Sequence, residues 1–299
     1  MMSKILSRMI DYLPPSLTEW MLRKRSESPM LTRLTARLAS SLRYREAQIS
    51  SGIGKGLFIN VGSSAAAYVL GTFKPDLQTY LSSNLKAGNV FYDVGANVGF
   101  FSLLAAKLIG PQGQVISFEP LPENLVSLRE NVERNHFSNV KILSFALGAA
   151  NEEQVFQVSE RPTWGKLKGA GHQLPDKYLS DMKVIVRRLD DLVTEGAIPP
   201  PDFVKIDVEG AEVEVVEGAV ETLMRYGPTL FIELHGTGNF LTQVFARIGY
   251  CAIPLNGKFT DVAQAHWNAT ILAFPAQQAT SIAAVRSLAH DPPGALHQS

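Results

Sequence analysis

From residue 90 onward, short apolar runs alternate with longer segments whose apolar positions recur every three or four residues. Such runs predict buried strands, and the periodic segments predict helices. The predicted strands are NVFYDV, GQVISFE, VKILSFAL, DFVKIDV and PTLFIELH, and the predicted helices span residues 98–109, 122–135, 211–225 and 238–248. Strands that alternate with helices are typical of a parallel sheet covered by helices on both faces.

The last two strand-like runs, YCAIPL and ATILAFP, follow one another without an intervening helix of useful length. Strands joined in this way pair antiparallel, so we expect a C-terminal edge hairpin. The sequence therefore predicts an α/β fold with a doubly wound, mostly parallel seven-stranded sheet.

A further strand, EQVFQV, precedes residues 159–183, where Gly, Pro and charged residues follow no clear period. We expect this segment to form an irregular loop or lid on the substrate side of the sheet. Trp164 and Tyr178 within it could stack on a sugar or close a small core.

The N-terminal region differs in charge from the rest of the chain. Residues 1–55 hold ten Lys or Arg against four Asp or Glu, although the whole chain has a formal net charge of +0. Met30, Leu34, Leu38 and Leu42 are spaced four apart with arginines between them, which predicts a basic amphipathic helix. It could pack on the body of the protein, on a second subunit or on a membrane surface, and an Arg-rich, acid-poor segment is also compatible with an organelle transit peptide.

These patterns divide the chain into a basic, mainly helical N-terminal extension (1–70), a main domain (71–275) and a C-terminal tail (276–299). No dense basic block is interleaved with aromatic residues, so nucleic acid is not an expected partner. No continuous apolar window reaches the length of a membrane span and no secretory signal is recognisable, so we expect a cytoplasmic protein. The single cysteine, Cys251, lies in an apolar run and predicts a buried thiol rather than a nucleophile.

The segment FYDVGANVGFF places an acid, two glycines and an asparagine between a predicted strand and a predicted helix. Gly95, Asn97 and Gly99 do not have the spacing of the dinucleotide fingerprint, which uses a third glycine to bring the helix close to the strand. Asp93 precedes the loop, where it would repel a diphosphate and favour a cation. S-adenosylmethionine carries an ammonium and a sulfonium and no phosphate, and is the cofactor that this pattern favours.

Glu119 ends the next predicted strand, in ISFEP, about twenty residues beyond the loop. A carboxylate at this place can accept hydrogen bonds from both ribose hydroxyls of an adenosine. Structural alternatives remain open for both acids, because Asp93 could cap the helix and Glu119 could be a solvated loop residue.

Several successive segments resemble those of the FkbM family of class I S-adenosylmethionine-dependent methyltransferases. They are FYDVGANVGFFS, SFEPLPENL, FALG, VKIDVEGAEVEVVEGA and LFIELHG, and the resemblance covers about residues 70–275. It implies a Rossmann-like fold, O-methylation of natural products or sugars, and cofactor contacts at Asp93, Gly95, Asn97, Gly99 and Glu119, with Ala146 near the adenine. The chain departs from the family in GTFKPDLQ, because Lys74 stands where an acid is common.

Charged residues also alternate with apolar ones at the ends of two predicted strands. In VKIDVEGAE, Asp207 and Glu209 follow Lys205 on one face, and in LFIELHG, Glu233 and His235 share a face. If the two strands are parallel neighbours, their carboxyl ends bring these side chains together beside the glycine loop. Lys205 is expected to pair with a neighbouring carboxylate.

Transfer of a methyl group to a hydroxyl needs a positioned nucleophile and a base for its proton. His235 is the predicted base, Asp207 would orient the acceptor hydroxyl or the cofactor ammonium, and Glu209 would bind a second substrate hydroxyl. Glu212, in the first turn of the next helix, is expected to interact with the helix dipole. The acids and His235 could instead bind a divalent ion, but no segment has recognisable metal-ligand spacing, so we expect no metal.

The sequence thus predicts an S-adenosylmethionine-dependent O-methyltransferase whose acceptor is a hydroxyl of a sugar or polyhydroxylated metabolite. The alternatives are a nicotinamide-dependent oxidoreductase, which Asp93 and the missing third glycine oppose, and a cofactor-binding scaffold protein without catalysis. A small-molecule or glycan acceptor is the expected partner, with membrane-surface or subunit contact through the basic extension.

Overall fold

A computed structural model of the chain describes residues 46–62, 66–159, 165–167, 178–255 and 261–279. The predicted basic amphipathic helix, Trp164 and most of the C-terminal tail lie outside these residues. Among the described residues, no helix has both the length and the apolar character needed to cross a membrane.

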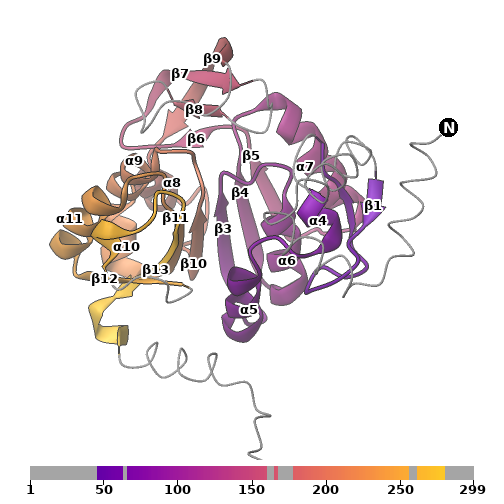
Figure 1. The fold of residues 1–299 in the computed structure, drawn as a ribbon, viewed down its shortest axis with the longest axis horizontal. Coiled ribbons are helices and arrows are strands. Elements are labelled where there is room, and N and C mark those ends of the chain that lie inside the picture. Colours follow the sequence, from indigo (N-terminus) through magenta and orange to yellow (C-terminus); the bar gives the residue numbers. More distant parts are fainter. Residues whose placement is uncertain (1–45, 63–65, 160–164, 168–177, 256–260, 280–299) are drawn as a thin grey trace, which may run out of the picture.

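A seven-stranded sheet forms the centre of the molecule (Figure 1). Its strands are β3 (Val90–Val94), β4 (Gln114–Phe118), β5 (Val140–Leu143), β10 (Phe203–Ile206), β11 (Thr229–Glu233), β12 (Tyr250–Pro254) and β13 (Thr270–Pro275). They lie in the order β12-β13-β11-β10-β3-β4-β5, in which the five from β11 to β5 are parallel and β13 is antiparallel to both β11 and β12. The predicted doubly wound sheet with an antiparallel edge hairpin is confirmed.

Two groups of helices cover the two faces of this sheet, as Figure 1 shows. The first group comprises α4 (Ala66–Leu70), α5 (Pro75–Asn84), α6 (Phe100–Ile109) and α7 (Pro122–Arg134). The second comprises α8 (Leu189–Thr194), α9 (Glu212–Glu217), α10 (Val220–Tyr226) and α11 (Gly238–Ile248), and the short 3-10 turns η2 (Val262–Gln264) and η3 (Ala276–Gln278) flank β13.

Side chains along each strand alternate between the two faces of the sheet, so the hydrophobic core has two layers. Phe91 packs into the core with α5, α6 and α7, whereas its neighbour Tyr92 packs into the core with α8 to α11. Successive strand side chains point to opposite faces, so a strand covered on both faces is apolar at consecutive positions. The continuous apolar run before Asp93 therefore encodes a central strand.

The helix predicted over 211–225 is divided into α9 and α10 at Gly218 and Ala219. A Cβ at Gly218 would lie 2.0 Å from the carbonyl oxygen of Gly148, so the backbones approach too closely for any side chain. The Asp190 carboxylate, from a distant part of the sequence, accepts hydrogen bonds from the backbone N–H groups of Glu221 and Thr222 at the start of α10. The helix is therefore interrupted by contacts with residues distant in the sequence, which the spacing of apolar residues does not reveal.

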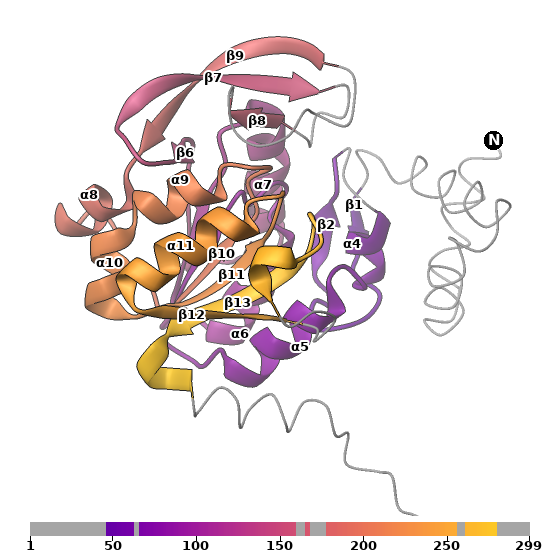
Figure 2. The ribbon, with the colours of Figure 1, turned by 60° about the vertical axis from the view of Figure 1, so that its left-hand side comes forward.

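A second, four-stranded sheet lies above one end of the central sheet (Figure 2). Its strands are β6 (Ala146–Leu147), β7 (Glu152–Ser159), β8 (Gly165–Leu167) and β9 (Tyr178–Arg187), in the order β6-β9-β7-β8. The expectation of an irregular loop over 159–183 is wrong for the part that forms β8 and the start of β9. Val184 and Val186 alternate with exposed residues and pack against Phe156 and Leu167, a pattern of period two that the surrounding Gly and Pro obscure.

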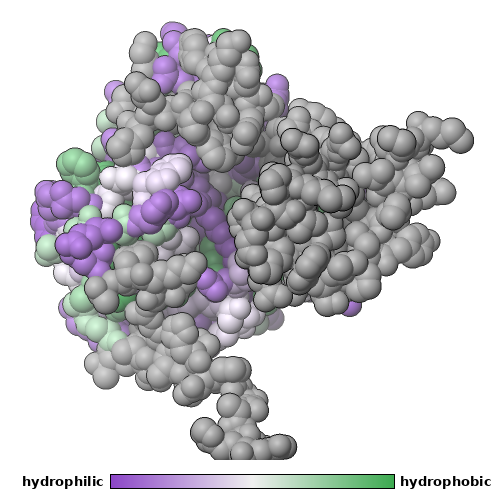
Figure 3. Space-filling model, viewed as in Figure 1, coloured by the Kyte–Doolittle hydropathy of each residue, from purple (hydrophilic) through white to green (hydrophobic). Residues whose placement is uncertain are grey.

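The described part of the N-terminal extension packs on the main domain. Strands β1 (Glu46–Gln48) and β2 (Phe58–Asn60) pair antiparallel. The side chain of Asn135, which directly follows α7, accepts a hydrogen bond from the N–H of Phe58 and donates one to its carbonyl oxygen. Ile49 and Ile59 are buried in the same core as α5 and α6. Residues 46–62 and 66–70 therefore share the core of the main domain. On the face seen in Figure 3, hydrophilic and apolar residues are interspersed over the α8–α11 side.

Candidate active site

A pocket of about 520 Å³ lies at the carboxyl ends of the central parallel strands. Ligands of doubly wound sheets bind at this edge, because the loops that follow the strands meet there. Polar and charged residues that line it are Asn97, Glu119, Asn124, Lys205, Asp207, Glu209, Glu233, His235 and Asn268. The two strand ends predicted to converge, those of β10 and β11, are parallel neighbours, so this expectation is confirmed.

The loop after β3 turns through backbone conformations that favour glycine. Gly95 has φ of +72°, and a Cβ there would lie 2.0 Å from the carbonyl oxygen of Asp207. At Gly99, with φ of +89°, a Cβ would lie 2.3 Å from Leu128 on α7. Gly95 and Asn97 line the pocket, whereas Gly99 allows α6 to pack closely against α7.

Glu119 connects this loop with the end of β4. Its Oε2 accepts a hydrogen bond from the backbone N–H of Asn97 at 2.7 Å, and its Oε1 accepts from the N–H of Leu121 at 2.9 Å. Burial raises the pKa of Glu119 despite these hydrogen bonds. The side chain of Asn124 also donates to Glu119. A carboxylate has about four acceptor positions, so Glu119 retains capacity for a further hydroxyl donor in the pocket.

Asp93 is not among the residues that line the pocket. It is completely buried, its Oδ2 accepts a hydrogen bond from Ser102 at 2.7 Å, and its Oδ1 lies 3.0 Å from Nζ of Lys205. Lys205 also donates to the carbonyl oxygen of Gly95 at 2.9 Å. The predicted pairing of Lys205 with a carboxylate is confirmed, and Asp93 acts on the glycine loop through Lys205 rather than by facing a ligand.

Asp207 and Glu233, from the ends of β10 and β11, share one cation. Nζ of Lys74 lies 3.1 Å from Asp207 Oδ2 and donates a short hydrogen bond to Glu233 Oε2. Burial opposes ionisation of Asp207, but Lys74 and Lys205 outweigh it and hold the pKa of this carboxyl well below its usual range. For Glu233 burial prevails, together with the charge of Asp207, and raises its pKa to about 7.

His235 lies between two further carboxylates. Its Nδ1 is 2.7 Å from Glu212 Oε1, and its Nε2 is 3.3 Å from Glu209 Oε2. Burial would lower the pKa of His235, but the hydrogen bond to Glu212 and the charges of both glutamates raise it to about 9. Burial raises the pKa of Glu209 to about 7, although the charge of His235 opposes this rise.

Glu212 has a different role from the expected interaction with the helix dipole. It is fully buried at the start of α9, and its second oxygen accepts a hydrogen bond from Thr237 at 2.9 Å. The backbone N–H of Gly210 donates to the oxygen that contacts His235. Glu212 therefore fixes the imidazole ring, a role that its position in a first helical turn does not reveal.

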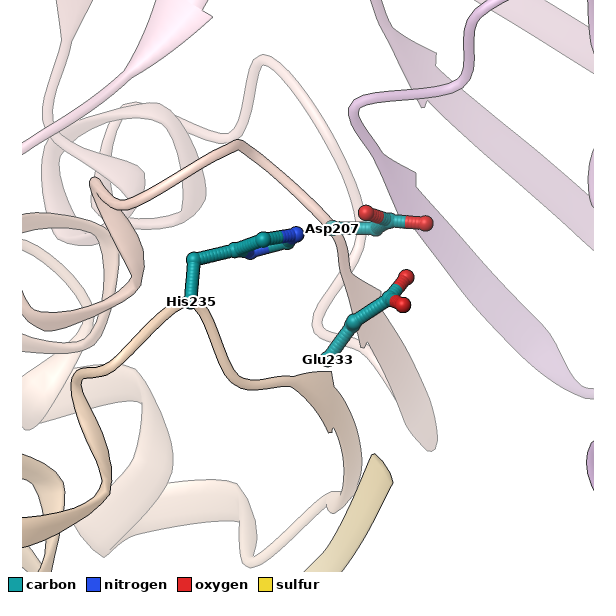
Figure 4. Close-up of side chains that lie close together, drawn as sticks. All are labelled: Asp207, Glu233 and His235. Carbon is teal, nitrogen blue, oxygen red and sulfur yellow. The ribbon is translucent and has the colours of Figure 1, made fainter. Parts of the chain in front are cut away.

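Asp207, Glu233 and His235 point toward one another in the pocket (Figure 4). Each offers one ligand atom, and these atoms all lie within 4.8 Å of one another. Such a set has the donor chemistry of a divalent-cation site, but Lys74 already contacts both carboxylates.

Apolar side chains complete the pocket. Ala146 lines it as predicted, together with Phe156 and Leu167 from the second sheet. Trp267 is 44% exposed, and its ring lies 5.9 Å from that of His235. Tyr68 also lines the pocket and stacks on Phe100 at 4.8 Å.

Most of the predicted site residues meet in this pocket. Those that line it are Gly95, Asn97, Glu119, Ala146, Asp207, Glu209 and His235. Asp93 and Gly99 do not line it, but Asp93 contacts the lining residue Lys205 and Gly99 lets Leu128 approach the loop. Sequence reasoning missed Tyr68 and Trp267 and assigned Glu212 to the helix dipole. It noted Lys74 only as a departure from the pattern of the family.

Comparison with known proteins matches residues 93–264 to the methyltransferase FkbM domain. Hexuronic acid methyltransferase AglP of Haloferax volcanii is 28% identical over 160 residues, which cover 54% of this chain and 62% of that protein. The chain thus spans less than two thirds of the length of this relative. 2-O-methyltransferase NoeI of Sinorhizobium fredii is 26% identical over 196 residues, covering 60% of this chain and 79% of that protein.

A solved structure of methyltransferase FkbM from Methylobacillus flagellatus KT is also similar. Its sequence is 18% identical, with a TM-score of 0.44, and the match covers 64% of this chain and 44% of that one.

Proposed function

This chain belongs to the methyltransferase FkbM domain family, and we propose that it transfers a methyl group from S-adenosylmethionine to a hydroxyl of a sugar or another polyhydroxylated metabolite. The observation that carries the proposal is a single pocket that joins the glycine loop and Glu119 to the cluster of Asp207, Glu209 and His235. The first group suits an adenosine ligand, and the second suits proton transfer from a hydroxyl.

The lining of the pocket supports binding of the cofactor. Gly95 lines the pocket with backbone and no side chain, and Glu119 presents a buried carboxylate to it. We propose that Glu119 accepts a hydrogen bond from a ribose hydroxyl and that Ala146 and Leu147 contact the adenine. The cofactor supplies an electrophilic methyl group on a positively charged sulfur.

Within the cluster, His235 accepts the proton of the acceptor hydroxyl. An imidazole with a pKa of about 9 begins protonated at neutral pH, so His235 becomes a base only after its Nε2 proton has moved. Glu209 is 3.3 Å from that nitrogen, and because its pKa of about 7 is raised toward that of His235, it accepts the proton more readily than an ordinary carboxylate would. His235 releases this proton more readily when positive charge enters the pocket, because like charges repel.

Asp207 remains ionised across the physiological range and orients the acceptor hydroxyl by accepting a hydrogen bond from it. Nε2 of His235 would then take the proton of this hydroxyl, which would leave its oxygen nucleophilic toward the methyl group that S-adenosylmethionine would supply. Glu212 keeps Nδ1 of His235 occupied, so the reactive nitrogen is Nε2.

Two features support a sugar acceptor. Trp267 offers a partly exposed ring beside His235, and an aromatic face packs well on the apolar face of a pyranose. Among the relatives, one is named for methylation of a hexuronic acid, which is a sugar acid, and another is named for methylation of an oxygen at position 2.

Isothermal titration with S-adenosylhomocysteine and with NAD, followed by incubation with methyl-labelled S-adenosylmethionine and a panel of glycosides, tests the proposal. We expect binding of the methyl-cycle ligand alone and label on a hydroxyl. Binding without transfer to any acceptor would favour the cofactor-binding scaffold, and binding of NAD alone would favour the oxidoreductase. His235→Ala should keep cofactor affinity while the transfer rate falls about 10² to 10⁴-fold.

A further inference from the structure

Lys74 has a strained backbone at the entrance to α5. Its φ is +47° and its ψ is +64°, the left-handed region that residues with a side chain rarely adopt. This conformation costs about 1–2 kcal/mol for a residue other than glycine. Strain of this kind persists where surrounding contacts enforce it, and it is found at functional sites.

The side chain of Lys74 supplies those contacts. It makes no capping hydrogen bond to α5 and instead reaches Asp207 and Glu233, across 133 and 159 positions of the sequence. All three side chains are at most 19% exposed. Burial would lower the pKa of Lys74, but the two carboxylates raise it above its usual value, so its amine carries a full charge.

The ammonium of Lys74 lies where a metal ion bound by Asp207 and Glu233 would lie. Asp207 and Glu233 offer two of the three ligand atoms that lie within 4.8 Å of one another, with His235 as the third. A divalent ion bound by both carboxylates would lie about 2.0–2.6 Å from their oxygens. Nζ of Lys74 lies within hydrogen-bonding distance of the same two carboxylates, so an ion and the ammonium would clash and repel.

We propose that Lys74 is a built-in cation that occupies a latent divalent-metal site formed by Asp207, Glu233 and His235. Lys74 is a positioning residue, because it holds the two carboxylates in place and offsets part of their charge without itself lining the pocket. While Lys74 is present, the pocket binds no divalent ion. Removal of the ammonium should expose the three ligands and convert the pocket into a metal site. This inference concerns the cation of the site and does not depend on the identity of the acceptor.

Titration of Mn²⁺ into the full-length protein, followed by calorimetry and by the electron paramagnetic resonance of free Mn²⁺, provides the test. Wild type should bind no Mn²⁺ at this site. Lys74→Ala should bind one ion with at least tenfold higher affinity than wild type, and adding Asp207→Asn to it should abolish the gain. Lys86→Ala is the matched control, because it removes an exposed lysine just after the same helix. It should leave Mn²⁺ binding unchanged.

Lys74→Met keeps the aliphatic stem against the Phe73 ring, which the ammonium now faces at 5.4 Å. This variant provides a second reading if Lys74→Ala is unstable, and it should show the same gain. A folded Lys74→Ala or Lys74→Met with no gain in Mn²⁺ affinity would overturn the proposal. So would a wild-type protein that binds one Mn²⁺ and loses it on Asp207→Asn, a result that needs neither lysine variant. None of these experiments measures methyl transfer, so failure of this proposal can be distinguished from failure of the proposed function.

Discussion

Nδ1 of His235 lies 2.7 Å from Oε1 of Glu212, a fully buried carboxylate at the first residue of α9. The pair joins the end of β11 to the helix that follows β10, two segments more than twenty residues apart. The imidazole thus has a fixed orientation and a raised pKa, which together determine which nitrogen can act and in which protonation state.

Glu212→Gln should lower the pKa of His235 by about one to two pH units, because glutamine can accept a hydrogen bond but carries no charge to favour the imidazolium. NMR titration of the imidazole Hε1 signal measures this, with the signal assigned by its loss in His235→Gln. Glu217→Gln is the control, since Glu217 lies on the same helix but pairs with Arg247. An unchanged titration in folded Glu212→Gln would show that this charge does not govern His235.

The raised pKa of His235 should make stability depend on pH. The folded state binds the imidazole proton more tightly than the unfolded chain, whose histidine titrates near 6.5. The stabilisation is therefore complete below about pH 6.5 and is lost as pH rises through about 9. The unfolding free energy of wild type relative to His235→Gln should fall over this range by up to about 3 kcal/mol. Urea unfolding at several pH values measures it, and a difference that grows with pH would contradict the assignment.

Glu119→Ala should weaken binding of S-adenosylhomocysteine by about 2–4 kcal/mol, the value of one to two charge-assisted hydrogen bonds. It also removes the acceptor of the Asn97 and Leu121 N–H groups, so the loop itself should become less ordered. Glu123→Ala removes an exposed acid from the start of α7 and should leave affinity unchanged. Equal affinity of the two variants in calorimetry would exclude a ribose contact at Glu119.

Gly95→Ala should be far more destabilising than Gly88→Ala. Both glycines have positive φ, but a Cβ at Gly88 meets no atom within 4 Å, whereas one at Gly95 would lie 2.0 Å from the Asp207 carbonyl oxygen. Gly88→Ala should cost about 1 kcal/mol from backbone conformation alone. Gly95→Ala should cost at least about 1–3 kcal/mol more from overpacking. Comparable midpoints of chemical unfolding for the two variants would mean that the loops after β3 and β10 are not in close contact.

Neutral acceptors should be methylated at least about tenfold more efficiently than acidic ones, on the order of 1.4 kcal/mol of repulsion. Among the described residues of the site, the cations Lys74, Lys205 and His235 are each paired with a carboxylate, so an acidic sugar finds no free positive partner. The measurement compares kcat/KM for a methyl glycoside, the matching uronate and the methyl ester of that uronate. The ester should recover the activity of the neutral sugar, and a preference for the free uronate would contradict the charge argument.

Much of the fold was readable from the sequence because its determinants are local. Continuous apolar runs such as FVKI and TLFIE encode strands buried on both faces, and the periodic segments between them encode helices. Both patterns depend only on side chains that are neighbours in the chain. The helix break at Gly218 and the β-structure after residue 164 were not readable, since they depend on contacts with Gly148, Asp190 and Phe156, which lie far away in the sequence.

The same distinction applies to the site. The sequence by itself placed Glu119, Asp207, Glu209 and His235 at the ends of strands, and parallel strands necessarily bring those ends to one edge. Only the tertiary structure decided what each group faces there. It turned Asp93 away from the pocket toward Lys205, brought Lys74 to Asp207 and Glu233, and set Glu212 against His235. Burial and charge pairing arise from groups distant in the sequence, so the protonation states that govern the chemistry are properties of the folded chain.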